Sequence, residues 1–193
     1  MPIFVAKSRT KTKNKTMTDF KTLVQTRRSV RKYTDQPIDA DDLKTILRAA
    51  LMSPTGKSVR GWHFIVVDDK NVLEKMSLCR PIGSQFLAEA KVAIVVLGDH
   101  ELTDVWTEDA SIAAVTMQYQ AADLGIGSCW CQIRNRYMND SESADNVLRF
   151  LLHYPQNLIA ECVIGLGYPA QERKPQNEDS LKWENVHVGT YTE

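Results

Sequence analysis

The chain has 193 residues, 43% hydrophobic and 25% charged, which suits one globular domain able to bury its own core. Its 24 basic residues balance its 24 acidic ones, so no global field would recruit nucleic acid or an anionic membrane. No stretch approaches the roughly 20 apolar residues that span a bilayer, and we expect a cytoplasmic protein with reduced thiols.

The zero net charge hides a basic start to the chain, because residues 1–16 contain five cations and no acid. We favour a disordered leader or an over-extended start, with Met17 as the natural beginning. The alternatives are a basic arm for nucleic acid or a targeting peptide. A secretory signal does not fit, since no apolar core of about 7–15 residues follows. Residues 17–169 would form the domain, and residues 170–193 an extended arm that packs on the domain or on a dimer partner.

Two helices are predicted before the first strand. Residues 19–25 form a short amphipathic helix, with Thr18 as its N-cap. Asp39 is a suitable N-cap for the second helix, and the Ser-Pro-Thr-Gly segment 53–56 ends it. The apolar stripe of this second helix is expected to comprise Leu43, Ile46, Leu47 and Leu51.

The next two apolar runs predict buried strands, at residues 63–67 and 92–97. A helix is predicted between them, at residues 71–78. The longest helix spans residues 106–124 and is apolar on more than one side, which is typical of a buried helix, here one between subunits. Gly125 ends this helix as the glycine that follows its C-cap.

The last elements are a strand at residues 128–133, a helix at 141–152 and an apolar strand at 158–166. Ser141 or Ser143 would cap the helix. The remainder of the chain is polar and contains little material for a core. This mixture of helices and strands predicts the α+β class, with a central, mostly antiparallel sheet flanked by helices.

The four cysteines suggest neither a disulfide framework nor a metal centre. Cys129 and Cys131 could be half of a metal site, but the four histidines are scattered and no second cysteine pair exists. Residues two apart on a strand share a face. We therefore interpret the pair as two buried thiols and expect no bound metal.

An arginine-rich turn follows the first helix. Arg27, Arg28 and Arg31 surround Ser29. Three guanidinium groups and a hydroxyl can hold an oxyanion through charge-assisted hydrogen bonds. Alone, however, the motif is more typical of a solvated basic turn.

Other nucleotide-binding and hydrolase motifs are incomplete. Gly56-Lys57-Ser58 matches the end of a P-loop, but Leu51 stands where the first glycine is needed and the triplet follows a helix. The Gly-x-Gly segments lack the third glycine of a dinucleotide fingerprint, and no nucleophile elbow appears. Asp109 is interpreted as a local cap or ion-pair partner rather than a general base. An enzyme of this sequence would therefore need a borrowed cofactor.

Four fragments, taken in order, resemble the nitroreductase family of FMN enzymes from about Phe20 to Pro169. They are R-R-S-V-R-K-Y, then A-A-L-M-S-P-T-G-K-S-V-R-G-W-H-F-I-V-V, then L-G-I-G-S-C-W-C-Q-I-R, and finally I-G-L-G-Y-P before a basic pair. The resemblance implies a nitroreductase-like homodimer with FMN at the subunit interface. It also implies an oxidoreductase that takes hydride from NAD(P)H at flavin N5 and reduces nitroaromatic, quinone or similar acceptors with ping-pong kinetics.

The same resemblance assigns cofactor contacts. Arg27 and Ser29 would bind the FMN phosphate with Arg28 beside them, and Arg31 would lie nearer the flavin N1–O2 edge. Arg173 or Lys174 would complete the phosphate site. Near flavin N5, main-chain N–H groups would come from Cys131, Gln132 and Ile133. From the other subunit, the flavin would be reached by Pro54, Thr55, Gly56 and Ser58.

The sequence departs from the family pattern at two places. In the usual P-S-x-x-N-x-Q-P-W segment, Ser58 replaces asparagine, Arg60 replaces glutamine and Gly61 replaces proline, which removes the family's side chains there. The usual glycine pair after the tryptophan is Gln132-Ile133 here. A main-chain N–H survives that change, but the added bulk can narrow the substrate pocket.

Three rival hypotheses stay open. One keeps the flavin but changes the reaction, to reductive dehalogenation or flavin fragmentation. Another is a non-enzymatic flavin-binding or redox-sensing protein. The third is a nucleic-acid binder that uses residues 7–15 and the arginine cluster, although the zero net charge and the missing aromatic platform argue against it.

Overall fold

The computed structural model describes residues 19–191, so the basic leader predicted for residues 1–16 and the expected cap Thr18 lie outside the described residues. The fold is built on a four-stranded sheet of order β1-β2-β4-β3, in which each neighbouring pair is antiparallel. The predicted α+β class with a mostly antiparallel sheet is confirmed. The strands are β1 (Trp62–Val67), β2 (Val92–Asp99), β3 (Gly127–Gln132) and β4 (Leu158–Gly167).

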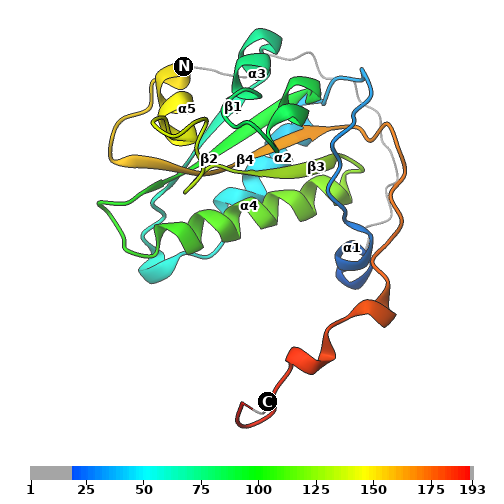
Figure 1. Ribbon diagram of the computed structural model, residues 1–193. Helices are drawn as coiled ribbons and strands as arrows, with labels where there is room; N and C mark the ends of the chain where they lie inside the picture. The colour runs from blue at the N-terminus through cyan, green and yellow to red at the C-terminus, as the bar shows by residue number, and fades with distance from the viewer. Residues whose placement is uncertain (1–18, 192–193) are drawn as a thin grey trace.

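Helices cover both faces of this sheet (Figure 1). α2 and α4 pack on one face, around Ile46, Ile94 and Met117. α3 and α5 pack on the other face, around Leu73 and Leu148. The sheet is therefore the middle layer of the domain. The α-helices are α1 (Phe20–Thr26), α2 (Ala40–Leu51), α3 (Lys70–Met76), α4 (Trp106–Asp123) and α5 (Ala144–Leu152).

The central strands β2 and β4 are buried along almost their whole length, whereas β1 is an edge strand. On β1, Trp62 and Val67 are buried, but His63 and Val66 are exposed. The expectation of a buried strand at residues 63–67 is therefore wrong in its burial, although the strand exists. An apolar run does not reveal whether a strand will have neighbours on both sides.

Side-chain capping sets the starts of the helices. Asp39 caps α2 and Ser143 caps α5, each accepting a hydrogen bond from a first-turn N–H. At α1 the cap is Asp19 and not Thr18, because the Asp19 carboxylate accepts from both the Thr22 N–H, at 3.0 Å, and the Thr22 hydroxyl, at 2.6 Å. The predicted cap Asp39 is confirmed, and of the two serines predicted as alternatives for α5, Ser143 is the cap. The predicted cap Thr18 is wrong.

Several apolar side chains of the domain remain on its surface. On α4, Ile112 and Val115 are 38% and 41% exposed. Leu51, predicted to belong to the buried stripe of α2, is 55% exposed, and Met52 beside it is 67% exposed. That part of the prediction is wrong, because periodicity shows which side of a helix is apolar but not how far the neighbouring layer extends along it.

The chain before α2 and the chain after β4 meet at the outer edge of the sheet. Ser29 forms a parallel bridge with Ser128 of β3, and Tyr33 forms a bridge with Pro169. After Pro169 the chain passes α1 and extends away from the domain as an arm (Figure 1). Exposed apolar side chains on this arm are Leu181, Trp183, Val186, Val188 and Tyr191.

Candidate functional site

The arginine-rich turn runs from α1 along the outer edge of β3. Val30 N donates to Ser128 O at 2.9 Å, and the Val30 side chain is buried. A Cβ atom at Gly127 would lie 2.8 Å from Val30 Cβ, so the two segments can approach this closely only because residue 127 is glycine. Since side chains alternate along an extended segment, burial of Val30 turns Ser29 and Arg31 to the opposite side.

Arg28 stands between two adjoining pockets at this edge, of about 380 Å³ and about 170 Å³. Arg173 lines the larger pocket and Arg27 the smaller one. Arg28 Nη1 also donates to Lys174 O at 2.6 Å, which joins the C-terminal arm to the turn. Of the two candidates on the arm, Arg173 therefore lines a pocket, while Lys174 contributes a main-chain oxygen to Arg28.

The cations of this cluster are not neutralised by the domain itself. Within residues 19–191, no carboxylate lies within ion-pair distance of Arg27, Arg28, Arg31 or Arg173. Arg27 lies over the Tyr119 ring of α4, with its Cζ 5.9 Å from the ring centroid. Neighbouring guanidinium groups without carboxylates repel one another, so an anion bound between them would be strongly favoured.

The loop between α2 and β1 has a strained backbone. Lys57, Ser58 and Arg60 adopt positive φ values of 52°, 58° and 57°. This left-handed conformation costs free energy for residues other than glycine, and it persists only where surrounding contacts hold it. Thr55 Oγ1 provides one such contact by accepting a hydrogen bond from Arg60 N at 3.1 Å.

Asp109 holds the same loop against α4. Its carboxylate is buried, with 3% of the residue exposed, and Oδ1 accepts a hydrogen bond from Gly56 N at 2.8 Å. A Cβ atom at Gly56 would lie 2.6 Å from Val105 Cγ2, so the approach requires glycine. The interpretation of Asp109 as a local cap or ion-pair partner is wrong, because its hydrogen bond crosses to a loop that is remote in sequence.

One chain does not bring the two predicted groups of cofactor residues together. The loop with Pro54, Thr55, Gly56 and Ser58 contacts the start of α4, whereas the arginine-rich turn contacts its end (Figure 1). Asp109 and Ala122, which mark these two contacts, are 13 residues apart, about 20 Å at the rise of an α-helix.

The end of β3 offers main-chain groups rather than side chains. Cys131 and Ile133 are 1% and 0% exposed and point into the apolar core. Peptide groups alternate between the two sides of a strand, and Gln132 O accepts from Arg80 Nη1, at 2.8 Å, on the outer edge of β3. The Gln132 N–H therefore points to that edge, while Ile133 N donates to Glu161 O within the fold.

The Gln132 side chain is the centre of a hydrogen-bond network. Its Oε1 accepts from Trp130 Nε1 at 2.9 Å, and its Nε2 donates to Glu161 Oε1 at 3.1 Å. Glu161 Oε2 accepts from Arg134 Nε at 2.8 Å. Glu161 sits where the pairing of β2 and β4 shifts by one residue, so this β-bulge turns a carboxylate toward β3.

Sequence reasoning missed Arg80 and Glu161. Glu161 had a visible signal, since it is the one charged residue in the apolar strand 158–166 and is 3% exposed. A charge in such a strand is rarely buried without a partner, and here the partner is Arg134. Arg80 had no comparable signal, because its contact with β3 depends on how the chain after α3 returns to the sheet.

The three cysteines of the sheet, on β3 and β4, are buried. Cys129 and Cys131 are each 1% exposed, as predicted for two buried thiols on one face of a strand. Burial raises the pKa of the Cys129 thiol and raises that of Cys162 well above its ordinary value. Neither thiol is therefore a candidate nucleophile near neutral pH.

Residues 19–191 contain no cluster of three or more histidine, cysteine or acidic side chains that could hold a metal ion. Within the same range, each helix is too short or too polar to pass through a bilayer.

A family model described as the nitroreductase family matches residues 24–78 and 78–168. Among solved structures, an FMN-dependent nitroreductase from Clostridium difficile R20291 is 45% identical, with a TM-score of 0.86. That likeness covers 88% of this chain and 98% of the other.

Curated relatives have similar descriptions. A protein of Archaeoglobus fulgidus, named provisionally as an NADH dehydrogenase/NAD(P)H nitroreductase, is 38% identical over 86% of this chain and 94% of its own length. An NADH dehydrogenase of Thermus thermophilus is 34% identical, over 85% of this chain and 93% of its own length.

Proposed function

The chain belongs to the nitroreductase family, and from this premise we propose that it is an FMN-dependent oxidoreductase that uses NADH or NADPH. Its acceptors would be nitroaromatics, quinones or similar small molecules, reduced by a ping-pong mechanism in which the nicotinamide leaves before the acceptor binds. The observation on which the proposal depends most is the group of arginines at the outer edge of β3 that, within residues 19–191, have no carboxylate at ion-pair distance.

The arginine cluster fits the phosphate end of FMN. The FMN phosphate is an anion, and guanidinium groups form charge-assisted, bidentate hydrogen bonds with such oxygens. Arg28 lines both adjoining pockets, Arg27 lines the smaller one, and Arg173 lines the larger one from the arm. Ser29 would add a hydroxyl donor, since burial of the Val30 side chain turns its neighbours outward.

The edge of β3 fits the ring end of the cofactor. When bound, FMN supplies hydride chemistry at its N5 atom. The Gln132 N–H is the donor at this edge, and Arg80 fixes the peptide plane by bonding to the Gln132 carbonyl. The Ile133 N–H donates to Glu161 O and is not available to the ring, and the side chains of Cys131 and Ile133 are in the core. Arg31 would place a cation where negative charge develops on the ring.

A homodimer would complete the site. The loop at Pro54–Ser58 lies at the far end of α4 from the arginine cluster, so one cofactor can touch both only if the loop belongs to a second subunit. The exposed apolar residues of α4 and of the arm would find cover in the same interface.

Spectroscopy of the purified protein tests the proposed function. With FMN the protein should be yellow, NADH or NADPH should bleach the flavin band without air, and an acceptor should restore it. A colourless protein that takes up no added FMN would refute the proposal. Bound flavin that neither nicotinamide bleaches would instead support a non-enzymatic flavin-binding protein.

A further inference from the structure

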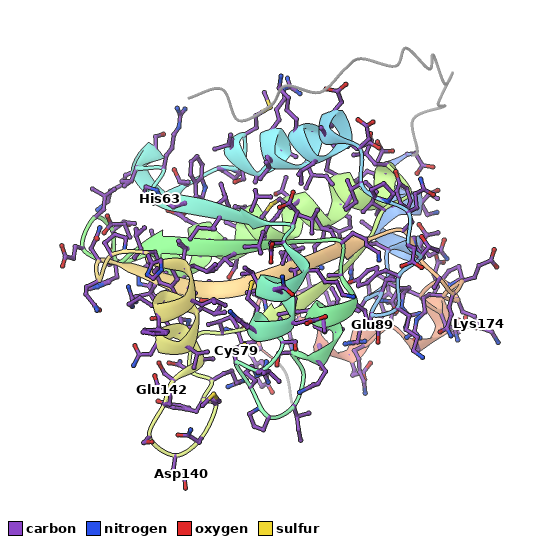
Figure 2. The ribbon with its side chains drawn as sticks, turned by 90° about the horizontal axis from the view of Figure 1, so that it is seen from above. His63, Cys79, Glu89, Asp140, Glu142 and Lys174 are labelled. Atoms are coloured by element: carbon purple, nitrogen blue, oxygen red, sulfur yellow. The ribbon has the colours of Figure 1, made fainter. Side chains whose placement is uncertain are left out.

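A third pocket, of about 280 Å³, lies between the start of α4 and the turn after β3. Its lining includes Trp106, Ile133, Arg134, Arg136, Tyr137 and Asp145, and it is called here the Arg134 pocket. Figure 2 shows Asp140 and Glu142, on the loop of this turn, on the opposite side of the domain from Lys174. The Arg134 pocket is thus separate from the arginine cluster proposed for the phosphate.

Arg134 is held rigidly at this pocket. Its Nε donates to Glu161 Oε2 at 2.8 Å, and its Cζ lies 6.0 Å from the centroid of the Trp106 ring. The Glu161 side chain is 4% exposed, whereas that of Arg134 is 37% exposed. Since the ion pair uses Nε, the two Nη groups form a fixed fork that is open to a ligand.

Arg136 supplies the positive charge that the protein leaves unbalanced here. Within residues 19–191 it has no carboxylate at ion-pair distance, and its Nη1 donates to the main-chain oxygen of Asn135. The one acid of the lining, Asp145, is already neutralised, because Oδ2 pairs with Arg149 at 2.6 Å and Oδ1 accepts from Ala160 N at 2.7 Å. The pocket therefore favours an anion.

The volume and the walls of the pocket indicate the size and the chemical character of the rest of the ligand. Pockets for drug-sized ligands measure about 300–1,000 Å³, so this one is too small for a dinucleotide but large enough for a single aromatic ring. Trp106 and Tyr137 provide aromatic walls, and Tyr137 is 60% exposed. We propose that the Arg134 pocket binds the negatively charged substituent of a single-ring aromatic acceptor.

This inference rests on the proposed function, since it selects among the acceptors of that oxidoreductase. Ile133 lines the pocket and directly follows Gln132, whose N–H faces the edge assigned to the flavin ring. An acceptor anchored by its carboxylate at Arg134 and Arg136 would therefore lie next to the reducing end of the site. A neutral acceptor of the same shape would lack this anchor.

Binding of an unreactive carboxylate tests the pocket without any turnover. Isothermal titration of the holoprotein should show benzoate binding at least about tenfold more tightly than benzamide, as expected for one charged hydrogen bond. The substitution Arg136→Gln should remove most of this difference in affinity and leave the affinity for benzamide unchanged. Arg48→Gln, an exposed arginine in the last turn of α2, is the matched control and should behave as the unaltered protein.

Steady-state rates with matched acceptors give the second readout. The protein should prefer 4-nitrobenzoate to 4-nitrobenzamide, and Arg136→Gln should raise KM for the acid alone. Equal binding of benzoate and benzamide, or an Arg136→Gln protein that matches Arg48→Gln, would overturn the inference. If the protein reduces both acceptors equally, the proposed function stands and only the ligand assigned to the Arg134 pocket is refuted. If the protein binds no flavin, the proposed function is refuted, while the benzoate titration still tests the pocket.

Discussion

Arg27 and Arg28 are neighbours in the chain but have different surroundings. Arg28 Nη1 donates to Lys174 O at 2.6 Å, so part of its hydrogen-bonding capacity holds the C-terminal arm. Arg27 lies over the Tyr119 ring and lines the smaller pocket, and no carboxylate of residues 19–191 forms an ion pair with it. At the scale of the residue, Arg27 is therefore the better test of a phosphate site, because its loss disturbs less of the fold.

Replacement of Arg27 by alanine should weaken FMN binding by about 1.5–3 kcal/mol, or roughly 10–150-fold in Kd, because a charged hydrogen bond to the phosphate is lost. Fluorescence titration of the apoprotein with FMN measures the effect. Lys32→Ala removes an exposed cation from the same segment and serves as the control. If the two variants bind FMN with equal affinity, Arg27 is not part of the phosphate site.

At the scale of the element, glycine decides how closely two segments can lie. The turn at residues 29–31 runs against β3 at Gly127, where a Cβ atom would lie 2.8 Å from Val30 Cβ. Gly61 is different, because the nearest atom to its Cβ would be 3.4 Å away, in ordinary contact. Replacing each glycine by alanine therefore distinguishes the effect of steric crowding, expected only at Gly127, from a general effect of replacing glycine.

The substitution Gly127→Ala should lower the free energy of unfolding by about 1–3 kcal/mol, because the added methyl group forces Val30 and the turn away from β3. It should also weaken FMN binding, since the displaced turn bears Arg27 and Ser29. Thermal or urea unfolding with and without FMN gives both quantities. If Gly61→Ala were equally disruptive, the close approach at Gly127 would not explain the effect.

The whole molecule presents apolar side chains that a single chain does not cover. On α4, Ile112 and Val115 are both exposed, although the same helix buries Ala113 and Met117 in the core. The arm adds Trp183 and Val188, which are 71% and 93% exposed. An arrangement of this kind is typical of a surface that a second subunit covers.

The double substitution Ile112→Glu/Val115→Glu should convert the proposed dimer to a monomer, because the interface would have to bury two charges. It should also abolish tight FMN binding if the Pro54–Ser58 loop acts in the partner's site. Light scattering coupled to size exclusion measures the mass. The control is Leu78→Glu, at a side chain 68% exposed beyond α3 on the other face of the sheet. A monomeric unaltered protein with full FMN affinity would contradict the dimer.

What the sequence determined by itself is local. Apolar runs predicted the four strands, and capping chemistry at Asp39 and Gly125 marked helix ends, since these features depend on residues a few positions apart. The spacing of four fragments likewise indicated the family, and the comparisons confirm it.

Only the tertiary structure decided which distant residues meet. The contacts of Arg28 with Lys174, of Gly56 with Asp109 and of Gln132 with Glu161 depend on the strand order β1-β2-β4-β3 and on one β-bulge. The burial of β1 was mispredicted for the same reason, since an apolar run does not reveal the number of its neighbours. Sheet order arises from packing of the whole chain. For this reason neither the hydrogen-bond partners of the site residues nor the Arg134 pocket could be located from the sequence.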